Sequence, residues 1–113
     1  MENIIYEENP RVKMTYFIKI HKSSRTIVAV CDSDILGKKF EEGIKQLDIR
    51  ETFYKDRELN AEELKKILIM QAKEESTFNI VGKESIKIAL ELGVITKNSI
   101  GKVQNIPFAL KLI

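Results

Sequence analysis

Residues 14–32, MTYFIKIHKSSRTIVAVCD, decide the fold, because they hold two runs of strand character separated by a polar pair. In the first run apolar residues alternate with others, the period of two that is typical of a strand, at Met14, Tyr16, Ile18 and Ile20. The second run, from Arg25 to Asp32, is rich in β-branched and apolar residues, and Ser23-Ser24 between the runs favours a tight turn. The stretch therefore predicts an antiparallel hairpin.

A two-residue loop at Ser23-Ser24 also predicts which side chains share a face. It places Ile20 opposite Ile27, Ile18 opposite Ala29 and Tyr16 opposite Cys31. We expect this apolar row to face the core. The other row mixes apolar and charged groups, and we expect it to be half covered at most or to serve as a binding face; it holds Thr15, Phe17, Lys19, His21, Thr26, Val28, Val30 and Asp32.

Further elements are predicted on the C-terminal side of the hairpin. Asn60 and Glu63 have the spacing of a capping box at the start of a helix, and Gly93 suits the residue that follows a helix end. In chain order the sequence predicts a turn over 33–36 before Gly37, a short strand pair over 40–50, a helix over 61–74, a strand over 77–81, a helix over 83–92, and two extended segments, 100–106 and 108–113, around Pro107.

These elements predict a single α+β domain over residues 14–113, preceded by an extension or arm over residues 1–13. The arm is polar, contains Pro10 and shows neither strand nor helix periodicity. We expect a small, mainly antiparallel sheet led by the N-terminal hairpin, with the two helices packed on its apolar face.

Composition narrows the classes of protein that fit. The lone cysteine, Cys31, rules out an internal disulfide, and no apolar run approaches the roughly 20 residues of a membrane helix, so we expect a cytoplasmic protein without membrane contact. Charged residues make up 32% of the chain and Trp is missing, a composition that leans toward a thermophilic source. The net charge of +2 is too small by itself to indicate nucleic-acid binding.

The distribution of charged residues along the sequence is more informative about binding partners than the net charge. Residues 9–39 carry seven basic residues against two aspartates. A stripe of cations down the mixed face of the hairpin would suit a phosphate backbone, although lysines on an ordinary solvated surface are the favoured explanation of the pattern. The candidate contacts to RNA or another partner are Lys19, His21, Lys22, Arg25, Lys38 and Lys39.

Chemically active residue types are few, and for none of them do we favour a chemical role; we expect His21 to face solvent or a partner. His21 is the only histidine, and the register turns it away from Cys31, which we expect to be an inert core thiol. Asp32 and Asp34 have the spacing to share a divalent cation, but capping or turn formation fits them better. We therefore predict no catalytic residues and no metal ligands.

Two further motifs carry weaker signals. Gly82-Lys83 at a helix start has the exposed amides that hold phosphate, yet it lacks a nucleotide loop's glycine spacing, so a plain strand-to-helix turn is favoured. Phe53-Tyr54 has the aromatic character for base stacking, but core packing is favoured because the pair lacks the aromatic pattern of an RNA-recognition sheet.

Several stretches together resemble an archaeal family catalogued as domain of unknown function 424. They are IKIHKS (18–23), VAVCDSDILGK (28–38), FY (53–54), NIVGKESIKIALELGVI (79–95) and IGKVQNIPFA (100–109). The resemblance implies a compact α+β domain, an archaeal origin and an association with the translation apparatus. Where members of the family carry a histidine after the final proline, this chain has Phe108.

The function we expect is that of a non-enzymatic accessory protein of the translation machinery, which docks on ribosomal RNA, a ribosomal protein or a ribosome-bound factor. One alternative is a small-ligand or metal-dependent enzyme that uses the Gly82 helix start or the Asp32/Asp34 turn. A second alternative is a protein-protein adaptor. The sequence predicts no cofactor and leaves the oligomeric state open.

Overall fold

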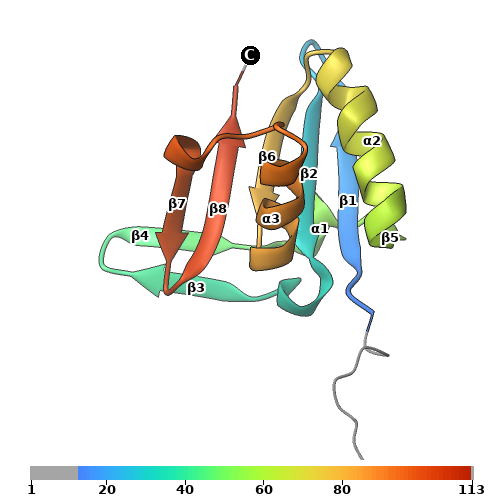
Figure 1. Ribbon diagram of the computed structural model, residues 1–113. Helices are drawn as coiled ribbons and strands as arrows, with labels where there is room; N and C mark the ends of the chain where they lie inside the picture. Colours follow the sequence, from blue (N-terminus) through green and yellow to red (C-terminus); the bar gives the residue numbers. More distant parts are fainter. Residues whose placement is uncertain (1–12, 113) are drawn as a thin grey trace, which may run out of the picture.

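A computed structural model of the protein describes residues 13–112, so residues 1–12 of the expected arm lie outside the described residues. The strands form a six-stranded sheet of order β5-β1-β2-β6-β8-β7 and a separate ribbon of β3 and β4 (Figure 1). Every strand pair is antiparallel except β2 with β6, which confirms a mixed α+β fold with a mainly antiparallel sheet. The strands are β1 (Tyr16–His21), β2 (Ile27–Asp32), β3 (Lys39–Glu42), β4 (Lys45–Asp48), β5 (Arg57–Leu59), β6 (Thr77–Val81), β7 (Ile100–Val103) and β8 (Ile106–Lys111).

Three α-helices and two 3-10 turns connect these strands. The helices are α1 (Glu51–Tyr54), α2 (Ala61–Lys73) and α3 (Lys83–Glu91), and the turns are η2 (Ser33–Ile35) and η3 (Lys97–Ser99). The predicted helices over 61–74 and 83–92 are confirmed as α2 and α3, whereas α1 and β5 had no counterpart in the sequence prediction. No helix within residues 13–112 is both long enough and apolar enough to cross a membrane.

The main sheet has apolar packing on both faces. The first cluster joins helix residues from α2 and α3 to one face of the central strands: Leu64, Leu68, Ile86, Ile88 and Ala89 with Ile18, Val28, Val30, Phe78 and Ile80. The second cluster lies on the other face, where α1 and the ribbon contribute to it: Ala29, Cys31, Ile35, Ile49, Tyr54 and Val81, with Phe40 and Leu47 packed against them. The domain therefore has two apolar clusters, one on each face of the main sheet.

The predicted register of the N-terminal hairpin is wrong by one residue. Cys31 lies opposite Phe17, and His21 opposite Ile27, because the connection spans residues 22–26 and is longer than the two serines. A shift of one residue moves a whole strand's side chains to the other face. Cys31 is therefore buried as expected, but it shares a face with His21, about 13 Å away along the strand.

The sequence of β2 did not reveal the true register of the hairpin because this strand is buried on both faces. The strand is flanked by β1 and β6, and all its residues except the first are buried. A strand covered on both faces reads as a continuous apolar run, so it carries no alternation against which the register can be checked.

The C-terminal strands also differ from the prediction. The chain reverses at Gln104-Asn105, which have φ values of 50° and 66°, and not at Pro107. Pro107 lies inside β8, where its carbonyl accepts a hydrogen bond from the Gly82 amide at 2.9 Å. The missing N–H of the proline is tolerated because the β6–β8 pairing ends here, at Val81 and Phe108.

Thr77 offers a stability prediction, because its buried hydroxyl is the only such side-chain group in residues 13–112 without a hydrogen-bond partner. The residue is 3% exposed, and valine has nearly the same shape. We expect Thr77→Val to raise the free energy of unfolding by about 1 kcal/mol, since the cost of an unpaired buried polar group is removed. Urea denaturation measures this change, with the exposed Thr96→Val as a control that should be nearly neutral. A loss of stability would show that the hydroxyl has a partner in solution.

Candidate functional site

The turn between β1 and β2 carries two exposed cations, Lys22 and Arg25. The hydroxyl of Ser23 donates to the carbonyl of Arg25 at 3.1 Å and closes this turn. Neither cation forms an ion pair with any residue of the part that the structure describes. Both are therefore available to an anionic partner.

Lys19 and His21, which the sequence assigned to the same surface, have intramolecular roles. The Lys19 ammonium donates to the carbonyl of Thr52 at 2.9 Å, and His21 Nε2 lies 2.8 Å from the carbonyl of Phe53, to which it donates. The imidazole also stacks on the Phe53 ring, with the centroids 4.6 Å apart. These side chains hold α1 against the second face of the sheet, where the expected binding face is thus partly covered.

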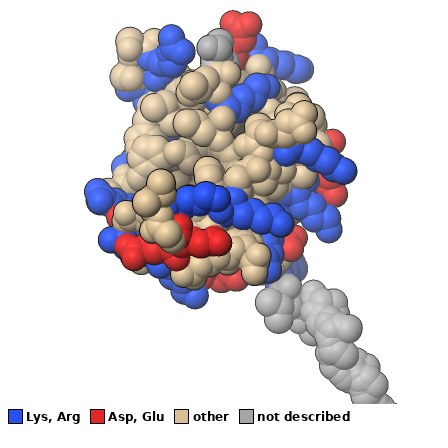
Figure 2. Space-filling model, turned by 90° about the vertical axis from the view of Figure 1, so that its left-hand side faces the viewer, with Lys and Arg blue, Asp and Glu red and all other residues tan. Residues whose placement is uncertain are grey.

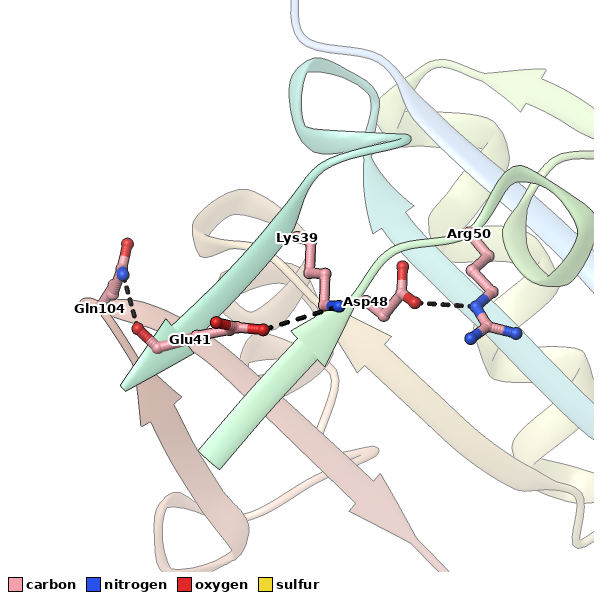
Figure 3. Close-up of polar contacts among 5 residues, drawn as sticks. All are labelled: Lys39, Glu41, Asp48, Arg50 and Gln104. Carbon is pink, nitrogen blue, oxygen red and sulfur yellow. Dashed lines mark hydrogen bonds and ion pairs between the residues drawn. The ribbon is translucent and has the colours of Figure 1, made fainter. Parts of the chain in front are cut away.

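Lys38 and Lys39 lie at the opposite end of β2 from the turn, and the six residues of that strand separate the two pairs by about 20 Å. Lys39 forms an ion pair with Glu41 at 3.6 Å, beside the contact of Gln104 with the ribbon (Figure 3). Lys38 is exposed. The six candidate residues therefore do not form one continuous stripe.

The start of α3 already binds an anion, and that anion is the carboxylate of Asp32. Its oxygens accept hydrogen bonds from the amides of Glu84 at 3.1 Å and Ser85 at 2.8 Å, and from the Ser85 hydroxyl at 2.6 Å. These amides are the donors that an incoming phosphate needs. Asp32 and Ser85 are both buried, so this cap joins the end of β2 to α3 inside the protein.

Gly82 permits the close approach of Asp32. Its φ of 115° belongs to a region that only glycine adopts readily, and a Cβ added here would lie 2.4 Å from Cγ of Asp32. A cavity of about 220 Å³ adjoins this point and is lined by Asp32, Asp34 and Glu84 as well as Lys83. Three carboxylates against one ammonium disfavour a phosphate ligand at Gly82 and Lys83.

Comparisons with known proteins give a matching family and a crystal structure of the same fold. A family model described as "Protein of unknown function (DUF424)" matches residues 21–112. The chain belongs to this family. A crystal structure of an uncharacterized conserved protein from Methanopyrus kandleri has the same fold, with a TM-score of 0.73, 22% sequence identity, and coverage of 85% of this chain and 89% of that one. No match was found among curated proteins.

In this DUF424 protein the remaining candidates for chemistry are the buried Cys31 and the exposed Asp34. Burial, with a smaller contribution from the charge of Asp32, raises the pKa of the Cys31 thiol to about 12, so a thiolate nucleophile is scarce at neutral pH. Asp34 is exposed, and residues 13–112 contain no group of three or more His, Cys, Asp or Glu side chains placed to hold a metal ion.

The aromatic pair of the DUF424 chain is structural. The buried Tyr54 donates its hydroxyl to Oδ1 of Asn79 at 3.1 Å, and Phe53 packs edge-on against it with centroids 5.0 Å apart. Burial also raises the pKa of Tyr54, which keeps its hydroxyl protonated as a donor. Tyr54 is buried and Phe53 contacts both Tyr54 and His21, so core packing accounts for both rings.

Sequence reasoning missed two features of this DUF424 structure. The Asp32–Ser85 contact joins residues 53 positions apart, so no local motif announces it. The open outer strand β7 was not recognised as an edge, because strand order is set by pairing between distant segments. The sequence signal that could have drawn attention to this edge is the set of three lysines, Lys97, Lys102 and Lys111, in a C-terminal stretch without acidic residues.

Proposed function

We propose that this protein is a non-enzymatic accessory protein of the archaeal translation machinery that docks on ribosomal RNA or a ribosome-bound factor. The observation that supports it most directly is the exposed cation pair Lys22 and Arg25 on the β1–β2 turn, which forms no ion pair within residues 13–112. The link to translation comes from the resemblance of the sequence stretches to the archaeal family.

The chemistry of the turn favours RNA among these partners. Arginine offers a planar fork of donors for two phosphate oxygens, and lysine adds a point charge. The turn connects two strands that pair over their full length, so the cations stand on a rigid support. Lys38 and Lys39, about 20 Å away, would reach a second segment of the phosphate backbone.

Cosedimentation with ribosomal particles tests the proposal. Purified full-length protein is mixed with ribosomal particles from an archaeal extract at physiological salt, and we expect it to travel with the particles and to be released at high salt. Migration entirely with free protein would contradict the proposal. Binding that survives nuclease treatment and depends weakly on salt would instead indicate a protein partner.

Charge reversal at the turn tests the residues. We expect Lys22→Glu with Arg25→Glu to weaken binding to ribosomal RNA several-fold and to leave the melting temperature nearly unchanged, because both side chains are exposed. The matched control is Lys66→Glu with Lys87→Glu, which makes the same change of charge at exposed sites on α2 and α3. If both double variants lost RNA binding equally, the effect would come from net charge alone. If the Lys22 and Arg25 variant bound RNA as well as the native protein, the turn would not be part of the interface.

A further inference from the structure

The outer strand β7 has a free edge. It pairs only with β8 and ends the six-stranded sheet, with no further strand beside it within residues 13–112. An exposed edge presents backbone donors and acceptors to which an extended segment of another chain can pair.

The pairing pattern tells which backbone groups of β7 are free. Val103 and Ile106 close a two-residue turn, so they form a hydrogen-bonded pair, and in an antiparallel ladder the next such pair is Gly101 with Phe108. Ile100 and Lys102 therefore direct their backbone groups away from β8. The Ile100 amide donates to the carbonyl of Lys97, which leaves the Lys102 amide and the carbonyls of both residues without a partner among the described residues.

The ribbon of β3 and β4 lies beside this edge and contacts β7. Its tip extends past β7 (Figure 1), and Ile44 at that tip is fully exposed. Gln104, in the β7–β8 turn, forms two hydrogen bonds to the ribbon. Its backbone amide donates to Glu42 Oε1 at 2.8 Å. Its side-chain amide donates to the Glu41 carbonyl at 2.6 Å (Figure 3). A strand added to β7 would therefore meet the tip of the ribbon.

The surroundings of the edge are basic and apolar. Residues 92–112 contain Lys97, Lys102 and Lys111 but no acid, and none of these lysines forms an ion pair with a described residue. Leu110 and Leu112 are more than half exposed and line a cavity of about 260 Å³ with Val94 and Ile95.

The space-filling view of this side agrees with that description. Figure 2 shows a broad uncharged surface with basic side chains around it and acidic ones mainly at its lower part. Among the acids of the ribbon, Glu41 pairs with Lys39 and Asp48 with Arg50, whereas Glu42 accepts from the Gln104 amide and has no ion pair within the described residues. The side as a whole therefore suits a partner that carries negative charge and apolar side chains.

We propose that β7 and the ribbon tip bind an extended acidic segment of a partner protein, which adds to the sheet as a seventh strand. An acidic residue of the partner lies opposite Lys102, and its neighbours in the segment point to the other face, where Val103 lies beside the ribbon. The segment thus alternates acidic and apolar residues. A second copy of this chain fits less well, because antiparallel β7 strands would bring their Lys102 side chains together.

A defined peptide probes the site in the full-length protein. The probe is a terminally blocked nine-residue peptide of alternating valine and glutamate, and the control peptide has lysine in place of glutamate. We expect the acidic peptide to shift the NMR signals of Lys102 and Ile44 and to slow hydrogen exchange of the Lys102 amide, which pairing would protect. No change at β7 with millimolar peptide, or changes at the β5 edge instead, would overturn the proposal.

Variants distinguish peptide binding at β7 from self-association and from RNA binding. We expect Lys102→Glu to weaken peptide binding about fivefold, and Ile44→Asp to weaken it similarly, whereas Lys87→Glu on α3 leaves it unchanged. Signals of β7 that shift with protein concentration in the absence of peptide would assign the edge to self-association and overturn the proposal. A loss of ribosomal RNA binding in Lys102→Glu equal to that of the Lys22 and Arg25 variant would assign it to RNA. Because the peptide assay contains no RNA, failure of the turn variants leaves its result unaffected.

Discussion

Replacing Gly82 with alanine is expected to lower the free energy of unfolding by about 4 kcal/mol, a large part of the stability of a domain of this size. The backbone φ of 115° strains any residue with a Cβ. The new Cβ would also lie 2.4 Å from Cγ of Asp32 and 2.6 Å from both carboxylate oxygens. Asp32 has little room to withdraw, since it is buried and bonded to the start of α3.

Gly43→Ala is the matched control for this variant. Gly43 also has a positive φ, of 63°, but nothing lies within 4 Å of the position of an added Cβ. We expect its replacement to cost about 1 kcal/mol, the strain of the backbone alone. Urea denaturation followed by circular dichroism measures both variants. Equal costs would mean that small movements relieve both the overlap with Asp32 and the stronger backbone strain at Gly82.

Asp32→Ala is expected to destabilise the protein by about 3 kcal/mol. The change removes three hydrogen bonds to a charged acceptor and leaves the amide and hydroxyl of the buried Ser85 without partners. Unpaired donors in a buried site are costly because no water replaces the lost acceptor. Asp34→Ala, two positions away on an exposed side chain, is the control and should change stability by less than about 0.5 kcal/mol.

A double-mutant cycle distinguishes the cap from a general effect of lost charge. In the Asp32→Ala background, Gly82→Ala should cost about 2 kcal/mol less than it does alone, because the carboxylate that overlaps the new Cβ is gone. Additive costs would show that Gly82 and Asp32 do not interact. An Asp32→Ala variant as stable as the native protein would show that the cap contributes little to stability.

Local patterns were enough to predict most elements. The Asn60–Glu63 capping box is present at the start of α2, and Gly93, with a φ of 74°, follows the end of α3. Such signals work because capping and turn residues act on neighbours a few positions away. The four-residue helix α1 was missed because it is too short to show a helical period.

Nonlocal pairing accounts for contacts at the candidate site that local patterns did not predict. Lys19 and His21 were expected on a binding face, but each bonds to a carbonyl of α1 more than 30 residues later. The exposure of Lys22 and Arg25 was predictable, because a polar turn between two strands lies at the surface.

By itself the sequence determined the α+β class, the positions of the principal strands and helices, the absence of an internal disulfide and the basic character of the hairpin turn. These properties depend on composition and on patterns that repeat within a few residues. Only the tertiary structure decided the register of the hairpin, the use of Asp32 as the cap of α3 and the exposure of β7 at the edge of the sheet. Each of these depends on which distant segments pack together, and that choice is made by the burial of the whole core.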